Sequence, residues 1–234
     1  MTDTAQLATN WTAVRVRVDE ACRAAGRDPA EVNVLPVSKT FGPDVVRAAL
    51  ALGLHRFGEN KVQEIREKAA ALAGEAIDWV VIGHLQTNKA KDVARLASEV
   101  QSLDRLELAD ALHRRLEAEN RTLDVLVQVK TAREETKHGL PGEELLGFLE
   151  RLRAYPTLRV KGLMTLATQS EDTNVVRACF RQLRELRDRC AMAGHSLPRL
   201  SMGMSGDFPL AIAEGATEVR IGTAIFGSRS YAAA

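Results

Sequence analysis

The sequence predicts an α/β protein that folds as a single eight-stranded (β/α)8 barrel of the TIM type, with an extra helix at its N-terminus. Three observations lead to this prediction. Short apolar runs alternate with helical segments along nearly the whole chain, which is the pattern of a parallel sheet. About eight such runs are present, which is the number that closes a barrel. The 234 residues also suit one barrel, because such a domain takes roughly 250 residues.

The N-terminal residues 1–27 are predicted to form the extra helix. Gly26 ends a run of apolar residues that recur at steps of three or four and therefore share one helical face: Leu7, Trp11, Val14, Val18 and Cys22. We assign residues 28–228 to the barrel and residues 229–234 to a tail. One domain is expected, because no linker rich in Pro, Gly or Ser divides the chain.

The eight strands are predicted from short runs that are rich in β-branched residues. In chain order they lie at residues 31–38, 54–57, 79–82, 99–102, 124–129, 159–163, 200–202 and 218–221. Each of the first seven is followed by a helical segment, at 43–52, 60–72, from about 88, 106–119, 142–153, 173–192 and 206–214. Pro43 marks a helix start, where proline is favoured. An open doubly wound sheet is the alternative, but no G-x-G-x-x-G follows the first strand.

The composition excludes several classes of protein. Lysine and arginine number 32 and aspartate and glutamate 31, so we expect neither nucleic acid nor a membrane surface as a partner. No apolar run approaches the roughly 20 residues of a membrane span, and no secretory signal is visible. The cysteines, Cys22, Cys179 and Cys190, have no C-x-x-C spacing. We therefore predict no disulfide framework and no metal site, and a cytoplasmic location.

Lys39 is the first candidate for chemistry. It directly follows the first predicted strand, and in a barrel the active residues lie at the carboxyl ends of the strands. Apolar walls around its stem would lower the pKa of the amine and free it for Schiff-base formation. The structural alternative is a strand-end lysine whose ammonium group extends to solvent.

Two further strand ends carry polar residues. Asn60 follows the second strand, where it can contact a ligand or cap the next helix. His84 follows the third strand and could act as an acid or base. For His84 we favour a structural role, because a lone histidine beside a glycine is more often structural.

The last two strands end in turns of small residues. Ser205 follows the seventh strand, and Gly222 and Thr223 follow the eighth. Turns that open a helix expose backbone N–H groups that bind phosphate, and in barrels the loops after strands seven and eight often form such a site. A phosphate site is favoured over the alternative of two ordinary turns.

A Schiff-base lysine and a phosphate cradle together describe a site for pyridoxal phosphate. Arg220 lies on the last strand, two residues before the cradle, and strand alternation points it into the same end of the barrel. Its guanidinium could donate to the pyridine nitrogen. Because arginine does not give up its proton, that nitrogen would stay unprotonated and the ring would be a weak electron sink. The structural alternative for Arg220 is a salt bridge inside the barrel with Glu218 or another carboxylate.

Over residues 7–228 the chain resembles the pyridoxal phosphate homeostasis protein family. The resemblance rests on six motifs: Val37-Ser-Lys39-Thr, Phe57-Gly-Glu-Asn60, Ile82-Gly-His-Leu-Gln-Thr-Asn-Lys89, Gly162-Leu-Met-Thr165, Leu200-Ser-Met-Gly-Met-Ser205 and Arg220-Ile-Gly-Thr-Ala-Ile-Phe-Gly227. It implies a barrel similar to the N-terminal domain of alanine racemase. It also implies a cofactor aldimine at Lys39, phosphate held around Ser205, Gly222 and Thr223, Arg220 near the pyridine nitrogen, and a role in handling the cofactor rather than in catalysis.

Three functions remain open at this point. We favour a cytoplasmic, monomeric protein that binds pyridoxal 5′-phosphate covalently through Lys39 and buffers it, or delivers it to apo enzymes, without turnover. The first alternative is a weak pyridoxal-dependent amino-acid racemase. A racemase needs a second base, and neither tyrosine of the chain, Tyr155 or Tyr231, lies at the carboxyl end of a strand; a second domain that would supply the base is not expected. The second alternative is a barrel enzyme that acts on a sugar phosphate without pyridoxal.

Overall fold

The strands form one parallel sheet that closes on itself. The computed structural model describes residues 4–132 and 138–227, and its strands run in the order β1-β9-β8-β7-β5-β4-β3-β2. Their bounds are β1 (Asn33–Pro36), β2 (Arg56–Glu59), β3 (Asp78–Val81), β4 (Ala97–Leu103), β5 (Leu123–Lys130), β7 (Leu158–Met164), β8 (Arg199–Met204) and β9 (Glu218–Ile221). A bridge between Val37 and Gly58 joins β1 to β2 and completes the circle. The predicted eight-stranded barrel is confirmed.

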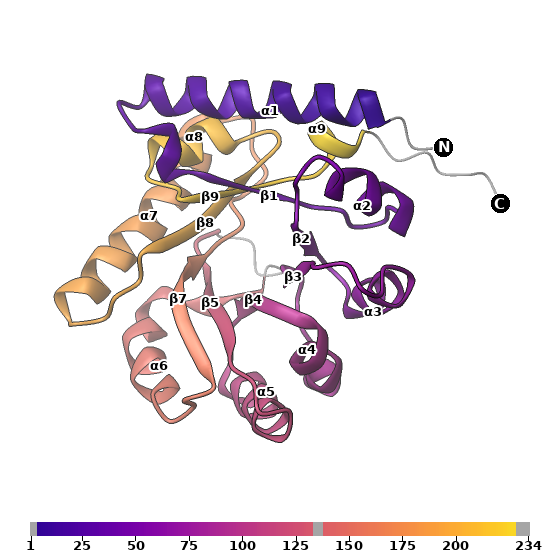
Figure 1. The fold of residues 1–234 in the computed structure, drawn as a ribbon. Coiled ribbons are helices and arrows are strands. Elements are labelled where there is room, and N and C mark those ends of the chain that lie inside the picture. The colour runs from indigo at the N-terminus through magenta and orange to yellow at the C-terminus, as the bar shows by residue number, and fades with distance from the viewer. Residues whose placement is uncertain (1–3, 133–137, 228–234) are drawn as a thin grey trace.

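Helices follow the strands and surround the barrel (Figure 1). They are α1 (Thr4–Ala24), α2 (Pro43–Leu50), α3 (Val62–Ala71), α4 (Ala90–Leu96), α5 (Leu106–Ala118), α6 (Leu145–Leu152), α7 (Thr173–Met192), α8 (Phe208–Ala213) and α9 (Thr223–Phe226). A two-residue strand that the sequence did not predict, β6 (Leu140–Pro141), pairs with β5 outside the circle. None of the helices in the described part of the chain has the length and apolar character that a membrane crossing requires.

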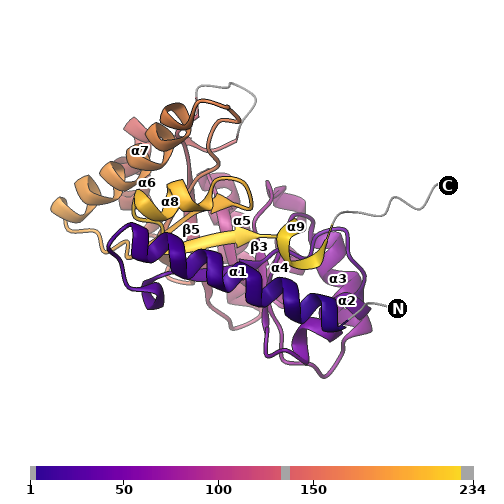
Figure 2. The same cartoon turned by 90° about the horizontal axis from the view of Figure 1, so that it is seen from above.

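The extra N-terminal helix α1 lies across α8 and α9, as Figures 1 and 2 show. It buries four of the five apolar residues that predict it: Leu7, Val14, Val18 and Cys22. The amide of Asn10 also donates to the carbonyl oxygen of Ile225 at 3.0 Å. The helix ends at Ala24, and Gly26 follows with a φ of +66°, a left-handed conformation that glycine adopts without strain. α1 therefore packs against the elements that follow the last two barrel strands.

Charged residues fill the amino-terminal end of the barrel interior. Glu99 and Glu218 are buried, and each accepts hydrogen bonds from both Arg56 and Arg199. The four N–O distances lie between 2.5 and 2.9 Å. Burial by itself raises the pKa of Glu218, but the two arginines outweigh burial and hold that pKa below its usual range. The barrel floor is thus a closed ion network.

The ion network predicts that the stability of the fold depends on Arg199. Arg199→Met should lower the free energy of unfolding by about 3 kcal/mol, because it leaves two buried carboxylates with the single positive charge of Arg56 between them. Arg114→Met is the matched control, since Arg114 forms an exposed pair with Asp110 whose loss costs about 0.5 kcal/mol or less. Urea denaturation followed by circular dichroism measures both. Equal losses in the two variants would contradict a structural role for the network.

Candidate functional site

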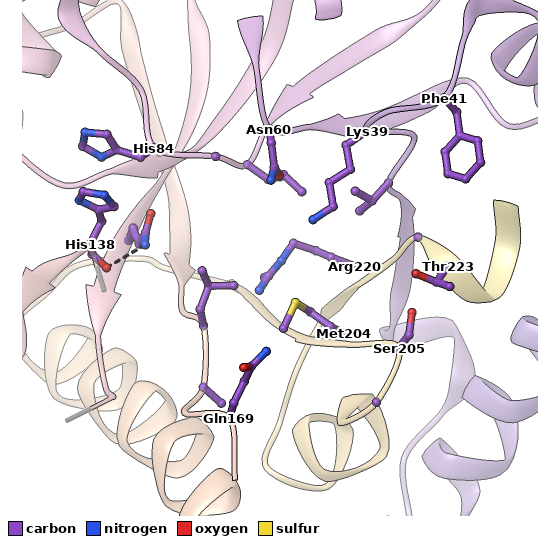
Figure 3. Close-up of a pocket in the computed structure, with 18 of the residues that line it drawn as sticks. Lys39, Phe41, Asn60, His84, His138, Gln169, Met204, Ser205, Arg220 and Thr223 are labelled. Atoms are coloured by element: carbon purple, nitrogen blue, oxygen red, sulfur yellow. Dashed lines mark hydrogen bonds between the residues drawn. The ribbon is translucent and has the colours of Figure 1, made fainter. Parts of the chain in front are cut away.

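A cavity of about 600 Å³ lies at the carboxyl ends of the barrel strands, which is a typical size for a small-molecule site. All six residues that the sequence predicted for the site line it: Lys39, Asn60, Ser205, Arg220, Gly222 and Thr223 (Figure 3). They come from the ends of four different strands. Closure of the barrel therefore brings these six predicted residues to one cavity.

Lys39 leaves β1 on a strained turn and points into the cavity (Figure 3). The next residue, Thr40, has a φ of +69°, which is unfavourable for a β-branched side chain. Its backbone N–H donates to Oε2 of Glu64 at 2.6 Å, and this bond holds the turn. Asn60 also lines the cavity and does not cap the following helix, because the cap of α3 is Lys61, without a side-chain bond. The turn thus fixes where the lysine stem leaves the strand.

A buried ion pair lies directly behind Lys39. Oε1 of Glu59 accepts hydrogen bonds from the hydroxyl of Ser38 at 2.5 Å and from Nζ of Lys68 at 2.6 Å. Nζ of Lys68 also donates to the carbonyl oxygen of Ser38 at 2.9 Å. Oε2 of Glu59 is buried and has no hydrogen-bond partner in the part of the chain that the structure describes. Burial raises the pKa of Glu59 to about 7, although Lys68 and Ser38 oppose the shift.

Arg220 is buried and is held by neutral acceptors. Nη1 donates to the hydroxyl of Ser201 at 2.8 Å, and Nη2 donates to the carbonyl oxygen of Thr165 at 2.9 Å. The salt bridge with Glu218, which was the structural alternative, is not formed, because that carboxylate is bonded to the floor arginines and Gln101. Burial lowers the pKa of Arg220 to about 10, against the attraction of Glu218 and Asp207. The guanidinium is therefore positively charged at neutral pH.

A hydrogen-bond chain connects Arg220 to the barrel floor. The hydroxyl of Ser201 donates to Oε1 of Gln101 at 2.7 Å, and Nε2 of Gln101 donates to Oε1 of Glu99 at 2.7 Å. Each donor in the chain has an acceptor, so the buried polar groups are satisfied. The ion network of the floor thus fixes the orientation of the arginine at the cavity.

The turns after β8 and β9 offer hydrogen-bond donors to the cavity. The hydroxyls of Ser205 and Thr223 lie on the same side of it (Figure 3). No described residue accepts a hydrogen bond from the backbone N–H of Gly222 or Thr223. A Cβ at Gly222 would lie 3.1 Å from the carbonyl oxygen of Val37, so glycine allows the close approach of β9 to β1. Two hydroxyls and two backbone N–H groups fit a phosphate group.

The opposite wall of the cavity carries four polar residues that the sequence did not predict as part of the site. His84, for which a structural role was favoured, lines the cavity together with Gln128, His138 and Gln169. Figure 3 shows His84 and His138 facing each other across a short gap. The three missed residues belong to loops and a strand without a recognisable motif, so their sequence positions gave no signal.

The fold places the chain in a known structural class. The family model described as the alanine racemase N-terminal domain matches residues 3–230. An alanine racemase of Clostridium difficile superposes with a TM-score of 0.76 at 13% identity, over 97% of this chain and 58% of that chain. At that identity the likeness shows the fold alone. The class is therefore that of the alanine racemase N-terminal barrel.

Relatives of higher sequence identity define the family within this class. The chain is 44% identical to the pyridoxal phosphate homeostasis protein of Aquifex aeolicus over 216 residues, which are 92% of this chain and 95% of that protein. PipY of Synechococcus elongatus, solved with PLP bound, superposes with a TM-score of 0.77 at 33% identity, over 90% of this chain and all of that one. The chain belongs to the pyridoxal phosphate homeostasis protein family, which confirms the resemblance stated from its motifs.

The raised pKa of Glu59 predicts a loss of stability as the pH rises. Between the unfolded-state pKa of about 4.3 and the folded value of about 7, the folded protein keeps a proton that the unfolded chain releases. The free energy of unfolding therefore falls as the pH rises through this window. Glu59→Gln cannot ionise, so we expect its stability to depend less on pH.

Urea titrations across this pH window test the prediction. Glu67→Gln is the matched control, because Glu67 lies on α3, the helix that follows Glu59 and carries Lys68, but is exposed, and it should keep the wild-type pH dependence. If Glu59→Gln retains the full wild-type dependence, another group is responsible.

Proposed function

We propose that the protein binds pyridoxal 5′-phosphate in this cavity, linked covalently to Lys39, and buffers the cofactor or delivers it to other proteins. One observation carries the proposal. An amine, a buried guanidinium and a set of hydroxyl and N–H donors line the same 600 Å³ cavity from different strands, and they match the aldehyde, the ring nitrogen and the phosphate of that cofactor. The solved relative PipY, whose title states that PLP is bound, supports it.

The cofactor supplies a reactive aldehyde, and Lys39 supplies the amine that reacts with it. Nζ of Lys39 would condense with that aldehyde and release water, and hydrolysis of the same bond would free the lysine again. Because the backbone is tied at Ser38 by Lys68 and at Thr40 by Glu64, the lysine stem starts from a fixed position. Such preorganisation favours binding, while the reversibility of the bond permits delivery.

Arg220 and the two terminal turns orient the ligand. A guanidinium donates hydrogen bonds and accepts none. At the ring nitrogen, Arg220 would therefore donate a hydrogen bond to an unprotonated atom and keep its proton. Ser205 and Thr223 would donate their hydroxyls to the phosphate oxygens, with the backbone N–H groups of Gly222 and Thr223 beside them. The charge of Arg220 adds a long-range attraction for the phosphate, because no carboxylate of the described residues is bonded to it.

We further propose that the protein does not turn over a substrate. An unprotonated ring nitrogen withdraws few electrons, which disfavours carbanion chemistry. No tyrosine lines the cavity among the described residues; Tyr155 packs instead against His113 on the outside of the barrel, and Tyr231 lies outside the described residues. The weak racemase remains the alternative candidate.

The same proposal includes the location, the oligomeric state and the partners of the protein. We place the protein in the cytoplasm as a monomer that serves apo enzymes. Cys22, Cys179 and Cys190 are buried free thiols, which suits a reducing compartment. A continuous core from α1 to β9 supports the single domain of residues 1–234; the helix assigned to residues 1–27 and the barrel of residues 28–228 share that core, and the tail of residues 229–234 lies outside the described residues.

Covalent binding at Lys39 is tested by borohydride trapping. Wild-type protein incubated with pyridoxal 5′-phosphate and reduced should carry one stable adduct on the peptide that contains Lys39, identified by mass spectrometry. Lys39→Ala should lose this adduct, whereas Lys91→Ala, at an exposed lysine on α4, should keep it. An unchanged adduct level in Lys39→Ala would refute the assignment, and a colourless protein with affinity for phosphate esters alone would favour the sugar-phosphate enzyme.

The absence of turnover is tested by hydrogen exchange at carbon. Single-enantiomer alanine or serine is incubated with the loaded protein in deuterium oxide, and deuterium at the α-carbon is measured by NMR. We expect wild type and Lys39→Ala to exchange at the same background rate. Exchange that depends on Lys39 and is accompanied by the opposite enantiomer would establish the racemase instead.

A further inference from the structure

Three side chains with metal-binding groups gather at the cavity rim, outside the cofactor site proposed above. His84 follows β3, Asp104 follows β4 and His138 precedes β6. Each offers one ligand atom, and the three atoms lie within 4.8 Å of one another. Nδ1 of His84 is 3.7 Å from Oδ2 of Asp104. The rings of His84 and His138 stack, with centroids 3.8 Å apart and planes inclined by 15° (Figure 3).

The first two groups are held in place by neighbouring residues. Nη1 of Arg105 donates to Oδ1 of Asp104 at 2.6 Å, which leaves Oδ2 on the side of His84. In the described part of the chain, no hydrogen bond reaches Oδ2. The hydroxyl of Ser102 donates to the carbonyl oxygen of Gly83 at 2.7 Å and ties the segment before His84 to β4. The carboxylate and the first imidazole are thus positioned independently of a metal.

The third group has a fixed backbone and an exposed side chain. Nε2 of Gln128 donates to the carbonyl oxygen of His138 at 2.9 Å. Gly139 has a φ of +136° and packs so closely that a Cβ would lie 2.8 Å from the backbone nitrogen of Lys130. The exposed imidazole of His138 can therefore rotate about its side-chain bonds, while its Cα stays beside β5.

We propose that His84, Asp104 and His138 bind one divalent transition-metal ion such as Zn²⁺. Two imidazoles and one carboxylate suit zinc-like ions, whereas Mg²⁺ and Ca²⁺ prefer sets of oxygen atoms. In a tetrahedral site with bonds of about 2.1 Å, ligand atoms lie roughly 3.4 Å apart. The separation of 3.7 Å between His84 and Asp104 is close to this value. Stacked rings cannot direct both lone pairs at one ion, so the ring of His138 must turn on binding.

The number of protein ligands leaves room for a further one. Three protein ligands leave a fourth position, which is the arrangement of metal sites that also bind water or a ligand oxygen. Because His84 and His138 line the cavity, that position is within reach of whatever the cavity holds.

The proposal differs from two expectations from the sequence. No metal site was expected, because the cysteines lack ligand spacing, and His84 was considered structural. Neither inference takes account of His138, which is far from His84 in the chain and reaches it only through the pairing of β6 with β5.

Calorimetric titration of Zn²⁺ into untagged, chelator-treated full-length protein tests the site. Wild type should bind one ion per chain. His138→Ala and Asp104→Asn should each weaken binding by at least about tenfold. His55→Ala is the matched control, since His55 is exposed and lies outside the cluster, and its affinity should equal that of wild type. With Co²⁺, the intense visible absorption of a tetrahedral complex should appear in wild type and be lost in His138→Ala.

Two results would overturn the proposal. One is the absence of binding to wild type. The other is binding of unchanged affinity in His138→Ala, which would place the ion elsewhere, for example at a cysteine. Because His138 is exposed, its substitution leaves the fold intact, and circular dichroism verifies this. The outcome is separate from that of the proposed cofactor role, since neither the titration nor the Co²⁺ spectrum uses the cofactor.

Discussion

The buried carboxylates Glu99 and Glu218 are the constraint on which the barrel interior depends. Both carboxylates are bonded to Arg56 and Arg199 at the floor, so neither carboxylate is left for the third interior arginine. Arg220 consequently keeps its positive charge facing the cavity, with a hydroxyl and a carbonyl oxygen as acceptors. In a low-dielectric interior, such an unneutralised charge attracts an anion far more strongly than it would in water. The pairing at the floor thereby determines what kind of ligand the opposite end attracts.

The position of Lys39 depends on residues that never face the cavity. Lys68 and Glu59 hold the carbonyl and hydroxyl of Ser38, and Glu64 holds the N–H of Thr40. The unfavourable φ of Thr40 persists because these bonds fix the chain on both sides of the lysine. Backbone strain at Thr40 and the buried pair of Lys68 with Glu59 are both costly, and the fold maintains both next to Lys39.

The sequence was sufficient to predict the fold and to place six residues at one cavity, because the spacing of apolar residues and the order of the strands carry that information. Strand ends converge in a barrel, so Lys39, Asn60 and Arg220 could be assigned to one end without coordinates. The partners of these residues could not be assigned. Lys68 lies in a helix whose pattern makes it resemble a surface lysine, and its burial arises only when α3 packs behind β1 and β2.

His138 illustrates a second limit of sequence reasoning. Its approach to His84 depends on the register of the two-residue strand β6, and no periodicity predicts so short a strand. The acceptors of Arg220 were missed for a related reason. The sequence shows that the carboxylate of Glu218 is close to Arg220 in the chain. It does not show that this carboxylate is bonded to two other arginines.

The junction between β1 and β2 has a consequence for how the proposed site would exchange a ligand. These strands meet at a single isolated bridge, Val37 with Gly58, whereas β5 and β7 pair along most of their length. Local opening of the barrel therefore costs least at this junction. Lys39 follows β1 and Asn60 follows β2, just beyond this junction. A molecule that contacts both residues would therefore link the two strands. Ligand binding would then slow the local opening of the barrel, and local opening would limit the rate of ligand release.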